Sequence, residues 1–270
     1  MRRRLKRREW FTNSSISNVQ LFKTDLHNHT LLSPCGDLDM SPDFIIEEAK
    51  RKGVDIIGIT DHNCTRHCRL AEHYSHNRDI FVMCGAEVTT KEEAHCLAFF
   101  ETHETLDLFQ KFLDEHLPDI PNVPEVFGDQ VQINEEFEIV YEEPKLLTSG
   151  LDVPIETIAA KVKELNGIFI PAHIDKSKNS VISQLGFIPF DLPYDAVELS
   201  KHGDKEKILQ QHPSLKDKTF TRASDAHLPD VIATAPCWFE LETRSFDEIR
   251  KALHQAEGRR VRLEIENNKV

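Results

Sequence analysis

The sequence predicts an α/β fold in which seven strands close into a barrel, and three observations support this. The chain has 270 residues, of which 39% are hydrophobic, enough for one large domain with a sizeable core. Short β-branched runs alternate with stretches of helical periodicity, which is typical of βα units around a parallel sheet. Histidines and carboxylates follow several of the apolar runs, where barrels of this kind place their chemistry.

The first strand, the first helix and the second strand are predicted from clear local signals. Apolar runs at 22–27 and 54–60 indicate two strands, the second of them buried. The helix between them can be capped by Ser41, has Pro42 at its first position and can end at Gly53. This order is one complete βα unit.

The remaining elements follow from the same periodicities. Further strands are expected at 80–87, 95–100, 168–173, 195–199 and 219–225. Further helices are expected at 105–116, 155–166, 204–211 and 245–257. The last helix opens with Ser245 and Glu248, which have the spacing of a capping box.

One stretch, residues 118–150, interrupts this alternation and is rich in proline and acidic residues. Val131 and Ile133, then Phe137 and Ile139, alternate with polar residues on both sides of a polar turn. This pattern predicts an inserted β-hairpin with a flanking loop. Such an insert could cover a site, form a contact in a homo-oligomer or extend into solvent.

The charge is distributed unevenly. The formal net charge is −13, yet residues 1–10 carry six basic residues and one acidic residue. We therefore expect a flexible basic arm at 1–20, followed by a single acidic domain at 21–270. The arm could contact RNA or anionic lipid. The acidic remainder argues against general affinity for long nucleic acids without excluding it, because phosphate binding usually needs a basic surface.

Composition also bears on the compartment. No apolar run reaches the roughly 18 residues that a membrane-spanning helix requires, so we expect no membrane partner. No apolar segment typical of a signal peptide follows the basic start. The six cysteines lie in apolar runs or beside histidines instead of forming a spaced framework. Reduced thiols and a cytoplasmic location are the resulting expectation.

The positions of the histidines are the most informative feature. Of the 14, six lie at or beside the ends of predicted strands: His27, His29, His62, His95, His173 and His227. His27 and His29 are two positions apart, so on an extended backbone they share a face and could bind one ion. Taken alone, such a pair is a weak signal.

Carboxylates at other strand ends strengthen the metal hypothesis. Asp61, Glu87 and Asp225 each close or follow a predicted strand. Charged residues that are buried at the ends of apolar strands cost free energy unless they are paired or bind an ion. Mixed imidazole and carboxylate ligands suit Zn, Mn or Fe better than Ca or Mg. The number of candidate ligands fits two or three divalent ions better than one.

The ordered set of these motifs resembles the PHP family, the polymerase-and-histidinol-phosphatase phosphoesterases. The resemblance runs from Thr24 to Trp238 through Asp25-Leu26-His27-Asn28-His29, Thr60-Asp61-His62-Asn63, Gly85-Ala86-Glu87, His95, Pro171-Ala172-His173 and Ser224-Asp225-Ala226-His227. It implies a distorted seven-stranded (βα) barrel that holds two or three metal ions. The ligands that it implies are His27, His29, His62, Glu87, His95, His173, Asp225 and His227, with Glu87 bridging two ions.

The sequence departs from the family pattern at one place. Many relatives have a further His or Asp ligand five or six residues after the second histidine of the pair. Pro34 and Cys35 occupy those positions here, and Pro34 has no metal-binding side chain. Cys35 as a thiolate and Asp37 from the same loop are the two alternatives.

The expected reaction is hydrolysis of a phosphate ester by a metal-bound hydroxide, with no protein nucleophile. A phosphomonoester of a nucleotide or small metabolite is favoured. The alternatives are an oligonucleotide phosphodiester, a non-catalytic metal-binding module, and an amidohydrolase-like enzyme acting on C–N bonds. Asp61 could bind a metal, accept a hydrogen bond from a ligand or carry a proton, and the second of these roles is favoured. Ser33 and Ser224 could orient ligand histidines. Lys176 and Arg222 are candidates for binding the substrate phosphate.

Overall fold

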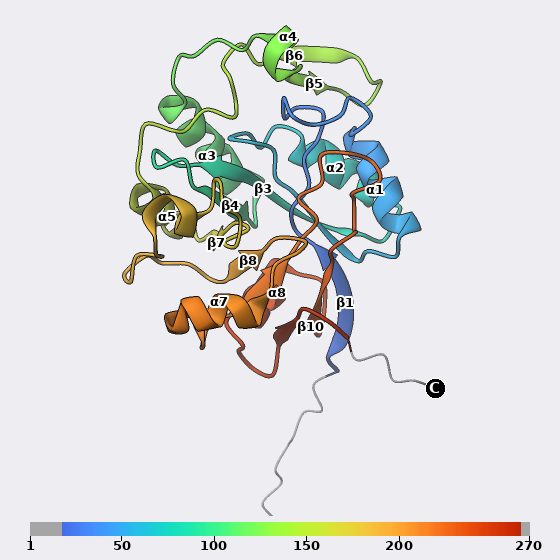
Figure 1. Cartoon of the computed structure of the whole chain (residues 1–270). Helices are drawn as coiled ribbons and strands as arrows, with labels where there is room; N and C mark the ends of the chain where they lie inside the picture. Colours follow the sequence, from blue (N-terminus) through green and yellow to red (C-terminus); the bar gives the residue numbers. More distant parts are fainter. Residues whose placement is uncertain (1–17, 266–270) are drawn as a thin grey trace, which may run out of the picture.

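The computed structural model describes residues 18–265 (Figure 1). Residues 1–17 and 266–270 lie outside the described residues, and so does almost all of the basic arm predicted at 1–20. Within 18–265, no helix is long and apolar enough to cross a membrane.

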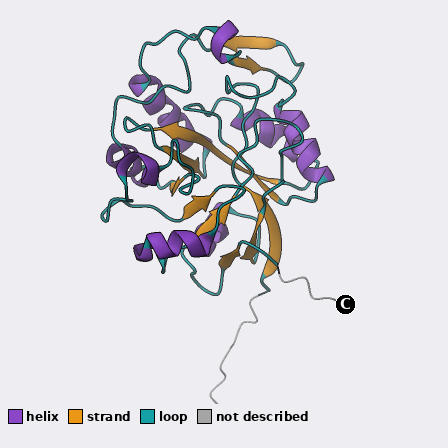
Figure 2. Ribbon diagram, in the orientation of Figure 1, coloured by secondary structure: helices purple, strands orange, loops and turns teal. Residues whose placement is uncertain are grey.

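The described chain is a mixed α/β structure whose main sheet curls into a half-barrel, with the helices arranged around it (Figure 2). Its seven strands occur in the order β11 (Arg260–Arg262), β10 (Cys237–Leu241), β1 (Gln20–Asp25), β2 (Ile56–Ile59), β3 (Phe81–Thr89), β4 (His95–Phe100) and β7 (Ile168–Pro171). A second, parallel pair consists of β8 (Val197–Leu199) and β9 (Phe220–Arg222).

The parallel pair β8–β9 continues the ring that the main sheet leaves open. On one side, the backbone N–H of Ile174, just after β7, donates to the carbonyl of Glu198 in β8 at 2.9 Å. On the other side, an isolated parallel bridge joins Asn28, after β1, to Ala226, after β9. All seven predicted strands are therefore present, and the predicted distorted barrel is confirmed.

Two details of the predicted sheet are wrong. β4 runs antiparallel to both β3 and β7, whereas the alternation predicted parallel strands throughout. Only five residues separate β3 from β4, and a parallel connection needs a crossover of about a dozen residues or more. In addition, β10 and β11, which pair antiparallel beside β1, were not expected.

The helices of the described chain are α1 (Pro42–Arg51), α2 (Cys68–Ser75), α3 (His103–His116), α4 (Pro124–Phe127), α5 (Ile155–Glu164), α6 (Val181–Leu185), α7 (Lys205–Gln211) and α8 (Phe246–Leu253), with a 3₁₀ turn at Pro213–Leu215. Ser41 caps α1 and Ser245 caps α8, as predicted. The capping box at α8 is wrong, however, because the Glu248 carboxylate binds Arg259 instead of the cap.

The two faces of the sheet carry two separate cores. On one face, α1, α2, α3 and α5 pack over alternating strand residues such as Ile57 and Val82. On the other face, Met83 and Phe99 pack with α8. Glu87 lies four residues beyond Met83 on β3, so it continues this second face. The second core therefore supports the end of the sheet from which Glu87 projects.

The insert at 118–150 contains the predicted hairpin, formed by β5 (Val131–Ile133) and β6 (Ile139–Glu142). It lies with α4 above the C-terminal ends of the parallel strands (Figure 1). Val131 and Ile133 form a small buried cluster with Leu31, which lies just beyond β1. The hairpin is thus packed on a loop that carries two of the candidate metal ligands.

Candidate metal centre

The eight predicted ligands come from six different strands and meet at one edge of the half-barrel. His27, His29, His62 and His173 follow the ends of β1, β2 and β7, Glu87 lies near the end of β3, and Asp225 and His227 follow β9. His95 opens β4, which is antiparallel, so its pairing with Thr89 brings it to the same edge. The antiparallel direction of β4 is therefore what makes His95 part of the group.

Glu87 is the centre of the group and is 1% exposed. The atoms facing Oε1 are His95 Nδ1 at 2.9 Å, His173 Nε2 at 3.1 Å and His27 Nε2 at 3.3 Å. The atoms facing Oε2 are His62 Nδ1 at 3.2 Å and His29 Nε2 at 3.3 Å. Burial alone would raise the pKa of Glu87, but the surrounding imidazoles hold it well below its ordinary value. Its two oxygens can therefore serve two cations at once.

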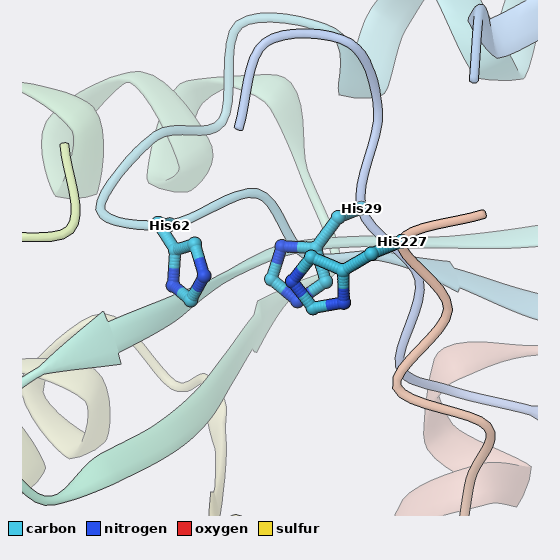
Figure 3. A group of neighbouring side chains, drawn as sticks. All are labelled: His29, His62 and His227. Carbon is cyan, nitrogen blue, oxygen red and sulfur yellow. The ribbon is translucent and has the colours of Figure 1, made fainter. Parts of the chain in front are cut away.

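Asp225 closes the group from the opposite side. Its Oδ1 lies 3.4 Å from His27 Nε2 and 3.6 Å from both His29 Nε2 and His227 Nδ1. The rings of His29 and His227 are stacked with centroids 4.0 Å apart, and His62 faces them from the loop after β2 (Figure 3). Among the described residues, three sets have ligand atoms within 4.8 Å of one another: His29, His62 and His227; His27, His29, Glu87 and Asp225; and His62, Glu87 and His95.

Hydrogen bonds turn the lone pairs of His27 and His29 toward this centre. His27 Nδ1 lies 3.0 Å from the Glu198 carboxylate, and His29 Nδ1 lies 3.0 Å from Ser33 Oγ, which itself donates to Asp61. Each Nδ1 therefore carries a hydrogen, and the two Nε2 atoms face each other at 3.1 Å. Two lone pairs at this distance repel unless a cation, either a proton or a metal ion, lies beside them.

The donor set fits divalent metal ions. The Nδ1 atoms of His62 and His173 are buried and make no hydrogen bond in the described chain. Burial and the neighbouring His29 hold the pKa of His62 well below its ordinary value, and the same two causes lower the pKa of His227 to about 4. Neutral imidazoles and ionised carboxylates are the forms that bind metals. The residues present could therefore hold divalent metal ions.

Two candidate ligands adopt backbone conformations that side chains usually avoid. His173 has φ +30° and Asp225 has φ +50°. Such left-handed residues cost on the order of 1–3 kcal/mol and persist where the surrounding structure holds them. His173 lies two residues after β7 and contacts Glu87, and Asp225 lies three residues after β9 and faces His27 and His29, so the strain accompanies the convergence of the ligands.

Asp61 and Ser224 do not join the three ligand sets. Asp61 accepts hydrogen bonds from the backbone N–H of Thr30 and from Ser33 Oγ, each at 2.7 Å, so it supports the loop that carries His29. Ser224 Oγ accepts from the N–H of Ala235 at 3.1 Å and contacts no imidazole among the hydrogen bonds described. Asp61 is thus connected to the candidate ligand His29 by hydrogen bonds through Ser33. Ser224 instead stabilises the loop in which it lies.

The structure separates the two candidate phosphate-binding residues. Lys176 Nζ donates to Asp225 Oδ2 at the rim of the centre, and its side chain is 41% exposed. The Arg222 guanidinium instead contacts the carbonyl of Gly203 at 3.4 Å and lies 3.7 Å from the carboxylate of Glu264. Only Lys176 is in contact with a candidate ligand.

The two alternatives for the missing family ligand lie outside the three sets. Cys35 is exposed as a residue, but the protein around its thiol group removes part of the water there. This desolvation and the charge of Glu87 raise the pKa of the thiol to about 12. Asp37 accepts a hydrogen bond from the N–H of Asp39 at 2.8 Å, which closes a turn of the loop. The backbone N–H of Asp37 donates to the carbonyl of His227, so the loop still borders the centre.

Two supporting residues, Glu198 and Asn179, were not predicted from the sequence. Glu198 is 1% exposed, accepts from His27 Nδ1 and also accepts from the backbone N–H of His173 at 3.1 Å. A charged residue between Val197 and Leu199, in a buried strand, was the signal that could have revealed it. Asn179, 3.1 Å from His95 Nε2, lies in a loop where no local pattern marks it. Ser33, which was expected to orient a ligand, lies 3.0 Å from His29 Nδ1.

Comparison with known proteins yields one family and several similar folds. The family model for the PHP domain matches residues 25–146. An uncharacterized protein of Methanocaldococcus jannaschii is 27% identical over 195 residues, which cover 69% of this chain and 86% of that protein. The sequence relationship therefore extends well beyond the residues matched by the family model.

Solved structures with similar folds include two of endonuclease Q. The lesion-specific endonuclease Q of Pyrococcus furiosus has a TM-score of 0.67 and 22% identity over 90% of this chain. An endonuclease Q bound to a 27-mer duplex with an abasic lesion at its active site has a TM-score of 0.66 and 21% identity over 89% of this chain. This chain spans only 58% of the length of each.

A third similar structure has nearly the same length as this chain. It is a protein of Bifidobacterium adolescentis provisionally assigned as a metal-dependent phosphoesterase, with a TM-score of 0.55 and 18% identity. The alignment covers 86% of this chain and 96% of that one. At these identities the likenesses concern the fold. The family relationship itself rests on the match of the PHP-domain model to residues 25–146, which the similarity of fold accompanies.

Proposed function

We propose that the chain hydrolyses phosphate esters at this centre, with two or three divalent ions held by His27, His29, His62, Glu87, His95, His173, Asp225 and His227. The observation that carries the proposal is that five histidines face the two oxygens of Glu87, while Asp225 and His227 complete the group beside His27 and His29. Zn, Mn or Fe suits the mixed set of imidazoles and carboxylates. Ions bound there would lower the pKa of a coordinated water and polarise a phosphoryl oxygen.

The residues of the chain would contribute orientation and charge. Glu198 and Ser33 hold the rings of His27 and His29 with their Nε2 atoms toward the centre. Lys176, at the exposed rim, would attract the phosphate group as a point charge, and its contact with Asp225 keeps Nζ beside the centre. Arg222 has no comparable support, because its contacts lead away from the centre.

A phosphomonoester of a nucleotide or a small metabolite is the proposed substrate. The formal net charge of −13 opposes the approach of a long polyanion, whereas a small ester needs only the cations and Lys176. One of the similar structures is a lesion-specific endonuclease, and the other is bound to a 27-mer duplex substrate. Oligonucleotides are therefore the natural comparison substrates. The acidic composition is the reason that we place them second.

The test is phosphate release from a panel of phosphomonoesters with added Mn²⁺ or Zn²⁺, with His27→Ala as the blank. Release by the unaltered chain and none by the variant is the expected result. Cleavage of oligonucleotides alone, including a duplex with an abasic site, would replace the monoester by a diester. Silence on both classes of substrate under saturating metal would refute the hydrolase proposal.

A second measurement tests the proposed role of Lys176. Lys176→Ala should raise KM about tenfold or more while the metal affinity changes little, because the lysine would meet the substrate and is not a ligand. Lys178→Ala, an exposed lysine two residues along the same loop, is the matched control. Equal kinetic constants for the two variants would remove Lys176 from the substrate site.

A further inference from the structure

A continuous row of hydrogen bonds connects the inserted hairpin to the loop that carries His29. At the hairpin end, the backbone N–H of Ile133 in β5 donates to Nε2 of His67 at 3.0 Å. Nδ1 of His67 lies 2.7 Å from Thr30 Oγ1, which donates to Asp61 Oδ2 at 2.8 Å. His67 itself precedes α2 and belongs to none of the ligand sets.

The two ends of this row fix the direction of the bonds at His67. A backbone N–H can only donate, so Nε2 of His67 carries the lone pair and the neutral ring carries its hydrogen on Nδ1. A carboxylate can only accept, so the hydroxyl hydrogen of Thr30 points to Asp61. Thr30 Oγ1 therefore accepts from His67, and the ring can hold only one tautomer.

Asp61 passes the same constraint to His29. Its Oδ1 accepts the hydroxyl hydrogen of Ser33 at 2.7 Å, which leaves Ser33 Oγ to accept from Nδ1 of His29 at 3.0 Å. Ser33 Oγ also accepts from the backbone N–H of His62 at 3.1 Å. The result is that Nε2 of His29 keeps its lone pair and faces Glu87 and Asp225.

Burial makes this row difficult to replace. His67, Thr30 and Ser33 are fully buried and Asp61 is 1% exposed, so water has little access to substitute for a missing partner. Burial also lowers the pKa of His67 to about 4, which keeps the ring neutral at neutral pH. The packing of Leu31 against Val131 and Ile133 joins the same two segments through apolar contact.

We propose that His67 is a positioning residue through which the inserted hairpin fixes the tautomer and orientation of His29 in the metal centre. The inference rests on the proposed metal site, and it assigns the insert a role in assembling that site. No substrate contact is required for this role, because the effect reaches the centre through Thr30, Asp61 and Ser33.

The test compares His67→Ala with His73→Ala in the full chain. His73 is a matched control because it lies on α2, is exposed, and also approaches the hairpin, at 3.6 Å from the Glu135 carboxylate. Zn²⁺ affinity is measured by competition with a chromophoric chelator. His67→Ala should bind about tenfold more weakly, within the range found when groups that orient ligands are removed. Equal affinity for the two variants overturns the proposal.

A second variant protects the test against a general loss of folding. Thr30→Val keeps the shape of the side chain but breaks the row at its middle. The double variant combines His67→Ala with Thr30→Val. If His67 acts through Thr30, this double variant loses no more Zn²⁺ affinity than Thr30→Val alone. Additive losses would show that His67 acts by another route and would overturn the proposal.

A third readout separates this inference from the proposed function. Burial alone would lower the pKa of His29, but Asp225 and Glu87 raise it, so the metal-free chain is studied at a pH high enough for the ring to be neutral. Under that condition the ¹⁵N chemical shifts of the His29 ring report its tautomer without any activity or bound ion. Hydrogen on Nδ1 in the unaltered chain, and a mixture of tautomers in His67→Ala, is the expected result. An unaltered tautomer would overturn the inference, whereas failure of the unaltered chain to bind any divalent ion would overturn the proposed function.

Discussion

At the scale of single residues, Glu198 is a group on which two candidate ligands depend. One of its oxygens accepts both from His27 Nδ1 and from the backbone N–H of His173. Without this acceptor, the ring of His27 loses the bond that turns Nε2 toward the centre. Glu198→Ala should therefore lower Mn²⁺ affinity about 10–100-fold, measured by isothermal titration calorimetry.

Two further variants separate the possible causes of such a loss. Glu198→Gln keeps an acceptor oxygen and should lose less affinity than Glu198→Ala. Glu206→Gln, on the exposed surface of α7, removes a carboxylate without touching the centre and should change nothing. An affinity that stays unchanged in Glu198→Ala would show that His27 is held by other contacts.

Also at the residue scale, His67 should make folding stability depend on pH. Its pKa is lowered by burial from 6.5 to about 4, so between these values the unfolded chain binds a proton that the folded chain does not. The free energy of unfolding must then fall as the pH is lowered from 6.5 toward 4. The loss at pH 5 is about 2 kcal/mol relative to pH 7.

Urea unfolding at pH 7 and pH 5 measures this loss. In His67→Gln the titrating group is absent, so the difference between the two pH values should shrink by about 2 kcal/mol. The other histidines titrate equally in both chains and cancel in the comparison. The same difference in both chains would mean that His67 is not held neutral by burial.

At the scale of elements, the insert depends on Gln130, which is 2% exposed. Its amide nitrogen donates to the carbonyls of Glu143 and Lys145 at 2.9 and 2.8 Å, and its oxygen accepts from the N–H of Leu147 at 2.8 Å. Gln130→Ala leaves these backbone groups unpaired, at a cost of about 1–3 kcal/mol for each one that stays buried. We expect β5 and β6 to lose protection in hydrogen exchange while the main sheet keeps its own.

Gln132→Ala is the matched control for this prediction. Gln132 lies in β5, is half-buried and belongs to the same hairpin, so its truncation changes the same local composition. Protection of β5 and β6 should survive in this variant. If both variants exchange alike, the hairpin is held by its apolar contacts with Leu31 and not by the amide of Gln130.

Comparison of the predicted and observed elements shows which of them local sequence patterns are sufficient to predict. Strands and the hairpin follow from periodicity, because burial on one face repeats every two residues. The direction of β4 depends on the length of its connection to β3, which the alternation of elements does not express. β10 has a clear alternation of buried and half-buried residues and could have been predicted, whereas β11 has only three residues.

In the candidate site, too, some residues could be predicted from local patterns and others could not. Each proposed ligand stands at or near a strand end, where a histidine or carboxylate contrasts with the apolar run beside it. Glu198 and Asn179 touch these ligands across 171 and 84 residues of sequence. Contacts of this kind arise only when the barrel closes, so a pattern read along the chain could not pair them.

At the scale of the whole molecule, the candidate ligands connect strands that the backbone joins only weakly. β1 and the segment after β9 meet through the isolated bridge between Asn28 and Ala226. His27 and His29 after β1, and Asp225 after β9, lie on the two sides of that bridge. Bound cations would therefore hold the open side of the half-barrel together.

This arrangement predicts that metal binding stabilises the entire fold. At a free metal concentration 100 times Kd, the free energy of unfolding should rise by about 2.7 kcal/mol if the unfolded chain binds no metal. Differential scanning calorimetry should show a higher Tm with Mn²⁺ that a chelator reverses. In His27→Ala the rise should be much smaller at the same metal concentration. The contradicting outcome is a Tm that does not change at metal concentrations where titration shows saturation. Such a result would place the binding outside the barrel edge, because ions bound between six strand ends would have to stabilise the sheet.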